Sequence, residues 1–248
     1  MAAHDEVFGL HAVEALLRQS PGRVESLRVQ SGRVDARMQA ILDQADRAGI
    51  PVTRLPRRDL DAQAGGATHQ GVIARAQPVA SLGEKDLPDV VMAPREGAPV
   101  LLLVLDGVTD PHNLGACLRT ADAAGVTAVI APRDRAVGLT PVVRKVACGA
   151  AESVPFIQVT NLARTLDLLK DLGVWTVGTT GEADTGLYDA DLTGPTALVL
   201  GAEGKGMRRL TAERCDALVC LPMRGQVESL NVSVAAGVCL YEAVRQRG

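Results

Sequence analysis

The feature that most limits the possible folds is a regular alternation of short apolar runs with amphipathic segments over residues 99–248. Apolar runs of this length are typical of buried strands, and apolar side chains at helical spacing are typical of helices packed on a sheet. Strands are expected at residues 100–105, 127–130, 174–178, 196–200 and 219–221, and helices at residues 114–124, 141–148, 162–172 and 232–247. Thr140 and Asn161 are expected to cap two of these helices. The alternation predicts an α/β domain with a mostly parallel sheet that is covered on both faces.

A second, smaller α/β unit is expected at residues 1–78. Helices at residues 9–18 and 34–48 alternate there with strands at residues 24–29, 51–55 and 72–76. Residues 79–98 contain prolines, glycines and charges of both signs, a composition that is typical of a linker. We therefore expect a domain at residues 1–78, a linker at 79–98 and a larger domain at 99–248.

Composition excludes several classes of protein. Hydrophobic residues make up 47% of the chain, which is enough for a core. The longest apolar run, residues 100–105, is too short for a membrane span, and residues 1–5 lack the pattern of a secretory signal. We expect a cytoplasmic protein with no membrane partner, whose five cysteines are mostly buried, reduced thiols. The histidines and cysteines lack metal-ligand spacing, so no metal is expected.

The charge and the aromatic content constrain how the chain could bind nucleic acid. The formal net charge is −3, which argues against a uniformly basic nucleic-acid coat but leaves room for a local basic site. Only five residues are aromatic, too few for the base-stacking sheets of common RNA-binding modules.

Three loops that follow expected strands are rich in polar side chains. In a parallel sheet, ligands bind at the loops that leave the carboxyl ends of the strands. The first loop, residues 106–115, contains Asn113 and leads into a helix that carries Arg119. An arginine between apolar neighbours is expected to need a partner, because a buried unpaired charge is costly. Asn113 alone is equally well explained as a helix cap.

The second and third loops limit the classes of reaction and ligand that the site could serve. Residues 201–206 contain three glycines, but Glu203 stands where a dinucleotide fingerprint has its second glycine. A carboxylate there would repel a pyrophosphate, which disfavours an NAD-dependent oxidoreductase. In the third loop Ser229 and Asn231 are both suitable helix caps, and Asn231 and Ser233 are unusual at the start of an otherwise apolar helix.

These three loops, in this order, resemble the motifs of the SpoU (TrmH) family of RNA ribose 2′-O-methyltransferases. The resemblance rests on Asn113-Leu-Gly-Ala-Cys-Leu-Arg119, on Gly201-Ala-Glu203-Gly204, and on Leu221-Pro-Met with Ser229-Leu-Asn231-Val-Ser. The segments Phe8-Gly9-Leu-His11 and Thr68-His69-Gln70-Gly71 are similar to the family's small RNA-binding domain. Within the family, the chain is most similar to members that methylate a guanosine ribose in 23S rRNA.

The resemblance implies a trefoil-knotted catalytic domain, S-adenosylmethionine as cofactor, 23S rRNA as partner, a homodimer formed through the catalytic domains, and a role in large-subunit maturation. It assigns catalytic roles to four residues: Arg119, Asn113, Glu203 and Asn231. Asn113 and Asn231 are expected to position the ribose and Arg119, and Glu203 to orient Arg119 through a charge-assisted bond. The cofactor is expected at five positions: Thr179, Gly201, Leu221, Met223 and Leu230.

The sequence leaves the RNA-contacting residues and some competing functions open. Candidates for RNA contact, each equally well explained as a solvated charge, are Arg57, Arg58, Arg133, Arg135, Arg144 and Lys145. A tRNA 2′-O-methyltransferase is the main alternative, but bacterial members of that kind mostly lack a unit like residues 1–78. A non-catalytic RNA-binding assembly factor of the same fold is a further alternative, against which the intact motif residues argue.

Overall fold

The computed structural model describes residues 4–33, 35–77, 82–93 and 98–248. The chain divides into two compact units, residues 1–80 and 81–248. Each unit is described here by itself. None of the helices over the described residues is long and apolar enough to span a membrane.

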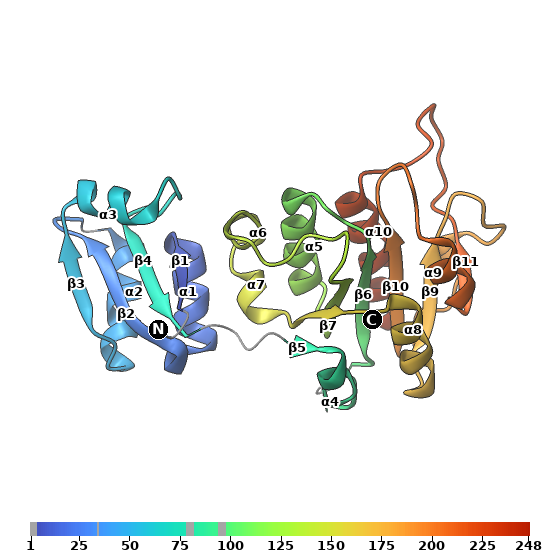
Figure 1. The fold of residues 1–248 in the computed structure, drawn as a ribbon, viewed down its shortest axis with the longest axis horizontal. Helices are drawn as coiled ribbons and strands as arrows, with labels where there is room; N and C mark the ends of the chain where they lie inside the picture. The colour runs from blue at the N-terminus through green and yellow to red at the C-terminus, as the bar shows by residue number, and fades with distance from the viewer. Residues whose placement is uncertain (1–3, 34, 78–81, 94–97) are drawn as a thin grey trace. The chain divides into compact units, whose positions relative to one another are not determined.

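The N-terminal unit is a four-stranded sheet with helices on both faces (Figure 1). The strand order is β1-β4-β2-β3, in which only the β2–β3 pair is parallel. Its elements are β1 (Asp5–Phe8), α1 (Leu10–Gln19), η1 (Pro21–Arg23), β2 (Val24–Gln30), α2 (Ala36–Arg47), β3 (Val52–Leu55), α3 (Arg57–Ala64) and β4 (Val72–Ala76). Val72 and Ala74 of β4 pack with α1 and α2, whereas Ile73 packs with Leu60 of α3, as the alternation of side chains along a strand requires.

The two N-terminal segments that resemble the family come together in this unit. The side-chain oxygen of Gln70 accepts a hydrogen bond from the Leu10 backbone N–H at 3.2 Å, at the start of α1, where Gly9 has no side chain that could cap the helix. His69 is buried, and its Nδ1 accepts from the Gly71 N–H at 3.0 Å. Its Nε2, 2.7 Å from Asp61 Oδ1, therefore carries the proton and donates to that carboxylate. These contacts give the segments a structural role.

The C-terminal unit contains a seven-stranded parallel sheet in the order β11-β9-β10-β6-β7-β8-β5. Its strands are β5 (Leu82–Gly83), β6 (Leu101–Asp106), β7 (Ala128–Pro132), β8 (Phe156–Val159), β9 (Trp175–Thr179), β10 (Thr196–Gly201) and β11 (Ala217–Val219). Its helices are η2 (Glu84–Asp86), α4 (Leu87–Met92), α5 (Pro111–Ala123), α6 (Pro141–Ala147), α7 (Ala150–Ser153), α8 (Leu162–Asp171), η3 (Leu187–Asp189), α9 (Arg209–Arg214) and α10 (Val232–Arg247).

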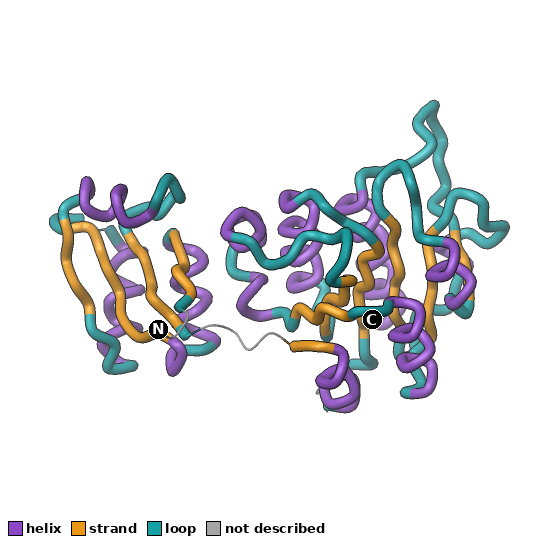
Figure 2. Tube along the Cα trace, viewed as in Figure 1, coloured by secondary structure: helices purple, strands orange, loops and turns teal. Residues whose placement is uncertain are grey.

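Helices cover both faces of this sheet, as the alternation in the sequence predicts (Figure 2). Along the central strand β6, Leu103 and Leu105 pack in the core that includes side chains of α5 and α10. Leu102 and Val104 face the opposite core, which includes side chains of α4 and α8. A strand buried on both faces explains why β6 is a continuous apolar run in the sequence.

The expectation of a linker at residues 79–98 is largely wrong. Residues 82–83 form β5, which pairs with β8 at the edge of the large sheet, and residues 87–92 form α4. Leu87 and Val91 lie one helical turn apart and are buried in the core. The prolines and charges of this segment indicated a linker, but this apolar pair anchors it to the second unit. Residues 78–81 and 94–97 lie outside the described residues.

The order of the strands creates a switch point between β6 and β10. From β6 the chain continues outward through β7 and β8, and then crosses to β9 and β10 on the other side of β6. At the carboxyl ends of the two adjacent central strands, Asp106 and Gly201 are partners in the register. The crevice outside such a point is where open α/β sheets bind their ligands.

Candidate functional site

Three of the four residues expected to act in catalysis meet at this switch point. Oε1 of Glu203 accepts a hydrogen bond from the side-chain amide of Asn113 at 3.1 Å and another from the Val232 backbone N–H at 3.2 Å. The side-chain amide of Asn231 donates to the same oxygen and also contacts Oδ1 of Asn113 at 3.0 Å. One carboxylate oxygen thus joins the loops that follow β6, β10 and β11.

The caps of two helices position the asparagines. Helix α5 begins at Pro111, earlier than the sequence indicated, because the Asp110 carboxylate accepts the His112 N–H at 2.9 Å. Asn113 therefore lies in the first turn of the helix, and its side chain is available to Glu203 instead of acting as the cap. Asn231 does cap α10, since its Oδ1 accepts from the Ser233 N–H at 2.9 Å.

Arg119, the fourth residue, is not held by Glu203. Its side chain is exposed, and its Nη1 lies 3.8 Å from Sγ of Cys148. The expectations of a buried arginine and of a charge-assisted bond to Glu203 are both wrong. Successive residues on a helix point about 100° apart, so Leu118 enters the core while Arg119 faces solvent. Cys148 is likewise exposed, unlike Cys117 and Cys239, which are buried as expected.

The backbone around Gly201 allows no side chain at that position. A Cβ there would lie 2.0 Å from the carbonyl carbon of Gly206 and 2.1 Å from the nitrogen of Met207. The loop closes on itself through the Gly206 N–H, which donates to the Ala202 carbonyl oxygen at 2.9 Å. The second motif therefore needs this glycine for a close approach of two backbone segments.

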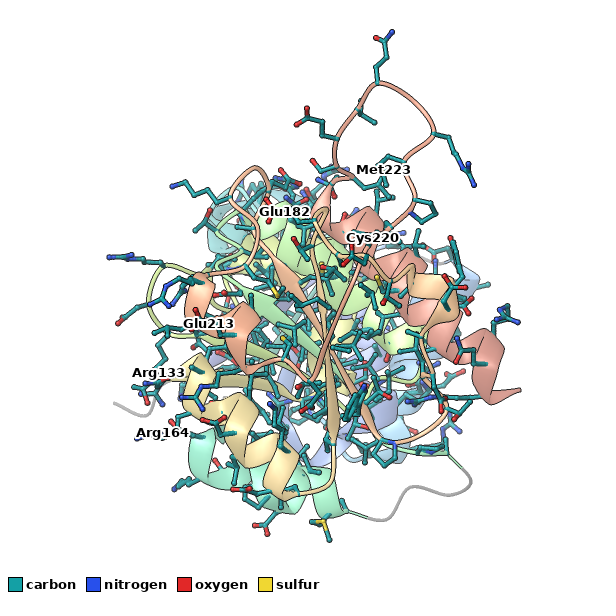
Figure 3. The ribbon with its side chains drawn as sticks, turned by 90° about the vertical axis from the view of Figure 1, so that its right-hand side faces the viewer. Arg133, Arg164, Glu182, Glu213, Cys220 and Met223 are labelled. Atoms are coloured by element: carbon teal, nitrogen blue, oxygen red, sulfur yellow. The ribbon has the colours of Figure 1, made fainter. Side chains whose placement is uncertain are left out.

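The other positions expected to bind the cofactor lie at the same edge of the sheet. Thr179 ends β9, and its Oγ1 is 3.4 Å from the Val199 carbonyl oxygen. Leu221, Met223 and Leu230 are half-buried and belong to the long loop between β11 and α10. Figure 3 shows Met223 on this loop, with Cys220 at its base. Half-exposed aliphatic side chains next to tightly folded backbone are suited to an adenosine group.

Sequence reasoning missed an ion pair that anchors the second loop. The side chain of Asp106 is 0% exposed, and its Oδ2 accepts the Arg208 backbone N–H at 2.8 Å. Its Oδ1 lies 3.1 Å from Nε of the same arginine. The signal in the sequence was an acidic residue at the end of an apolar strand, but nothing pointed to Arg208 as its partner.

The candidates for RNA contact differ in their surroundings. Arg57 and Arg58 lie near carboxylates of α3, and Arg144 pairs with Glu152. Arg133 and Arg135 are exposed, and no carboxylate in the described part of the chain pairs with either. Lys145 lies in the last turn of α6. Over the described residues, no group of three or more His, Cys, Asp or Glu side chains could hold a metal ion.

Comparison with known proteins decides the family. Residues 100–241 match the SpoU rRNA methylase family. The chain belongs to this family. Residues 7–82 also match a family described as RNA 2′-O ribose methyltransferase substrate binding, so both units of this SpoU protein have counterparts.

Three relatives illustrate the match. The 23S rRNA (guanosine-2′-O-)-methyltransferase RlmB of Pseudomonas aeruginosa is 59% identical over 247 residues, which cover 100% of this chain and 98% of the relative. The structure of the SpoU methyltransferase AviRb from Streptomyces viridochromogenes with the cofactor AdoMet is 26% identical, with a TM-score of 0.79, and covers 98% of this chain and 90% of that chain. The A. aeolicus TrmH/SpoU tRNA modifying enzyme is 32% identical, with a TM-score of 0.55, and covers 66% of this chain and 82% of that chain.

Proposed function

We propose that this protein transfers a methyl group from S-adenosylmethionine to the ribose 2′-oxygen of a guanosine in 23S rRNA, during maturation of the large ribosomal subunit in the cytoplasm. The proposal rests on the cluster in which Glu203 accepts hydrogen bonds from Asn113, Asn231 and Val232 at the switch point of the sheet. It is supported by the similarity to RlmB, which extends over almost the full length of both chains, and by the cofactor in the AviRb structure. The tRNA modifying enzyme covers only two thirds of this chain, which favours the rRNA substrate over tRNA.

One group of residues in the site would bind the cofactor, and a second group would orient the ribose. Gly201, Thr179, Leu221, Met223 and Leu230 would hold the cofactor, whose sulfonium group supplies an electrophilic methyl when bound. Asn113 and Asn231 are fixed by Glu203 and would orient the ribose hydroxyl, so that little rotational freedom is lost when the reaction occurs. The carboxylate acts here on the asparagines and not on the arginine.

Arg119 would stabilise negative charge rather than remove a proton. A guanidinium holds its proton far above neutral pH, so its neutral form is scarce near pH 7. The described contacts of Arg119 leave most of its N–H groups available, because its one recorded partner is a thiol. We assign it to an RNA phosphate and to the 2′-oxygen as negative charge develops there, with the proton leaving to phosphate or water.

We also propose that two copies associate through their catalytic domains and that the chain is knotted near α10. Val234 and Tyr241 of α10 are 52% and 51% exposed, and Val238 lies half-buried between them at helical spacing. An apolar helical stripe of this kind favours a second copy as its partner. The path of the chain after β11 supports the knot. Cys220, which follows the edge strand β11, pairs with residues 185–187. The chain then returns, and α10 packs on α5 and β10.

The test is nucleoside mass spectrometry of 23S rRNA from a strain that lacks the gene. We expect the loss of one 2′-O-methylguanosine, restored by the intact gene and not by an Arg119→Ala copy. An unchanged rRNA profile with a lost ribose methylation in tRNA would assign the enzyme to tRNA instead. Recovery of the mark with the alanine copy would remove Arg119 from the mechanism.

A further inference from the structure

Arg208 is held from one side by a carboxylate that solvent does not reach. The Asp106 side chain is 0% exposed, and its two oxygens face the backbone N–H and Nε of Arg208 at 2.8 and 3.1 Å. Oδ2 accepts the backbone hydrogen bond, whereas Oδ1 forms no hydrogen bond and lies against Nε as an ion pair. The carboxylate therefore fixes the backbone of the arginine and holds its guanidinium nearby by charge. Asp106 ends β6 next to Gly201, so this contact also closes the loop of the second motif.

Within the described residues, the outer edge of the same guanidinium has no hydrogen-bond partner. The Arg208 side chain is 45% exposed, and neither Nη atom bonds to an acceptor in the described part of the chain. Nη2 lies 3.9 Å from the place of a Cβ on Gly107, the first residue after β6. The terminal nitrogens thus lie at the carboxyl edge of the sheet, in the loop that also carries Glu203. An arginine oriented in this way offers a planar pair of donors to an oxyanion.

The surrounding charges favour a polyanion at this edge. Arg119, Arg135 and Lys205 follow neighbouring strands, and none of them pairs with a carboxylate in the described structure. The backbone of Arg135 also reaches Gly107, since its carbonyl oxygen is 3.9 Å from the Cβ position. Nearby carboxylates already have partners: Glu203 accepts three N–H groups and Asp110 caps α5. Asp134 remains as an acidic neighbour in the loop after β7.

We propose that Arg208 binds a phosphate of the RNA backbone next to the methylated ribose, and that buried Asp106 is the positioning residue for it. This inference rests on the proposed function and names the phosphate contact of the same site. The carboxylate of the cofactor has the same chemistry as a ligand. We choose the phosphate because the additional cations, Arg135 and Lys205 on the loops after β7 and β10 and Arg119 within α5, fit a chain of phosphates better than one small anion.

A variant that removes the charge of Arg208 must also remove the charge of the buried residue 106. Arg208→Gln alone leaves the Asp106 carboxylate buried without its cation, which can unfold the protein. The double variant Asp106→Asn/Arg208→Gln removes both charges, and the asparagine oxygen can still accept the backbone N–H of residue 208. Arg208→Lys is a second variant that keeps the ion pair but lacks the planar donor pair. Arg209→Gln is the matched control, because Arg209 is the adjacent residue and pairs with Glu213 at 2.6 Å on the exposed surface.

The measurements are thermal unfolding, S-adenosylmethionine binding by calorimetry, and binding of a 23S rRNA fragment by the full chain over a range of KCl concentrations. We expect the double variant to unfold near the native temperature and to bind the cofactor as before. We expect its RNA affinity to fall about tenfold, and the slope of log affinity against log salt to shrink by roughly 0.7 to 0.9, the value for one lost phosphate contact. Arg208→Lys should lose affinity several-fold, and Arg209→Gln should leave affinity and slope unchanged.

Native RNA affinity and slope in both Arg208 variants would overturn the proposal. A loss of cofactor affinity with an unchanged salt slope would also overturn it and would assign the anion to the cofactor. If the wild-type protein binds RNA through Arg208 but methylates no guanosine, the proposed function fails while the phosphate contact of Arg208 holds. If the wild-type protein does not bind the RNA, both fail.

Discussion

The amide nitrogen of Asn113 lies 3.1 Å from Oε1 of Glu203, although 90 residues separate them in the chain. This hydrogen bond joins the loops after the two central strands of the parallel sheet. By itself, Asn113 is equally well explained as a helix cap, and Glu203 only disfavours a dinucleotide site. Their chemistry arises from the contact.

Replacing Glu203 should lower the methylation rate much more than it lowers the stability of the fold. Glu203→Ala removes the acceptor for Asn113, Asn231 and the Val232 N–H, so we expect the methylation rate to fall at least tenfold. Because water can reach this exposed site, the free energy of unfolding should fall by only about 1 kcal/mol. Glu203→Gln keeps one oxygen and should retain more activity. Single-turnover kinetics and urea unfolding measure the two effects, and a fully active alanine variant would contradict the role of the cluster.

Substitutions of Arg119 should affect the rate without affecting stability. Its side chain is exposed, and over the described residues its hydrogen bonding is limited to the Cys148 thiol, so Arg119→Ala should change the free energy of unfolding by less than about 0.5 kcal/mol. Loss of a stabilising donor should lower the rate by roughly 10². Arg119→Lys keeps the charge but loses the planar donor pair, so we expect less than a tenth of native activity. Near-native activity of the lysine variant would exclude a bidentate role.

Gly201→Ala should disrupt the second motif through a backbone clash. The added Cβ would meet Gly206 at 2.0 Å, and the loop would have to open, at a cost of ~1–3 kcal/mol in the free energy of unfolding. Affinity for S-adenosylmethionine should fall with it, as titration calorimetry can measure. Gly225→Ala is the matched control, since a Cβ at that position has no neighbour within 4 Å. Equal behaviour of the two variants would argue against the close approach as the cause.

The cysteines should differ sharply in reactivity. Burial raises the pKa of the Cys117, Cys215 and Cys239 thiols to about 12, so at pH 8 they contain almost no thiolate. Iodoacetamide should therefore modify exposed Cys148 first, as peptide mass spectrometry would show. Because Cys148 contacts Arg119, its modification should reduce methylation, and Cys148→Ser should resist that inhibition. Loss of activity in the treated serine variant would place the sensitive thiol elsewhere.

Glu242 should stabilise the protein in a pH-dependent manner. Hydrogen bonds from Arg245 and Gln246 hold the pKa of the Glu242 carboxyl at about 2, below its ordinary value of 4.5. A pKa that is lowered on folding contributes stability above pH 4.5, and this contribution is lost as the pH falls toward 2. Glu242→Gln should cost ~1–2 kcal/mol at pH 7 and almost nothing near pH 2. Urea unfolding at several pH values measures this effect, and Glu213→Gln is the control at an exposed position. If the difference in unfolding free energy between Glu242→Gln and the native protein did not depend on pH, the prediction would be wrong.

Much of the local structure was predictable from the sequence. The Thr140 and Asn161 side chains cap α6 and α8 as expected, and α10 has the expected bounds, residues 232–247. The sequence missed several short elements: β1, α3, β5, α4, α7, β8 and α9. Strands of two to four residues and helices with few apolar side chains have too little periodicity to be recognised, and tertiary packing stabilises them instead.

By itself, the sequence determined the α/β class, the parallel sheet and most helix ends, because these follow from the spacing of apolar side chains and from local capping. The residues of the three motifs were found through their resemblance to the SpoU family. Only the tertiary structure showed that Glu203 accepts hydrogen bonds from the asparagines and not from Arg119. It alone also showed that Asp106 bonds to Arg208 and that residues 82–92 belong to the unit of the large sheet. Parallel pairing brings the carboxyl ends of β6 and β10 together regardless of the chain length between them. Which side chains then touch depends on register and on the direction of each side chain, and the spacing of residues along the chain encodes neither.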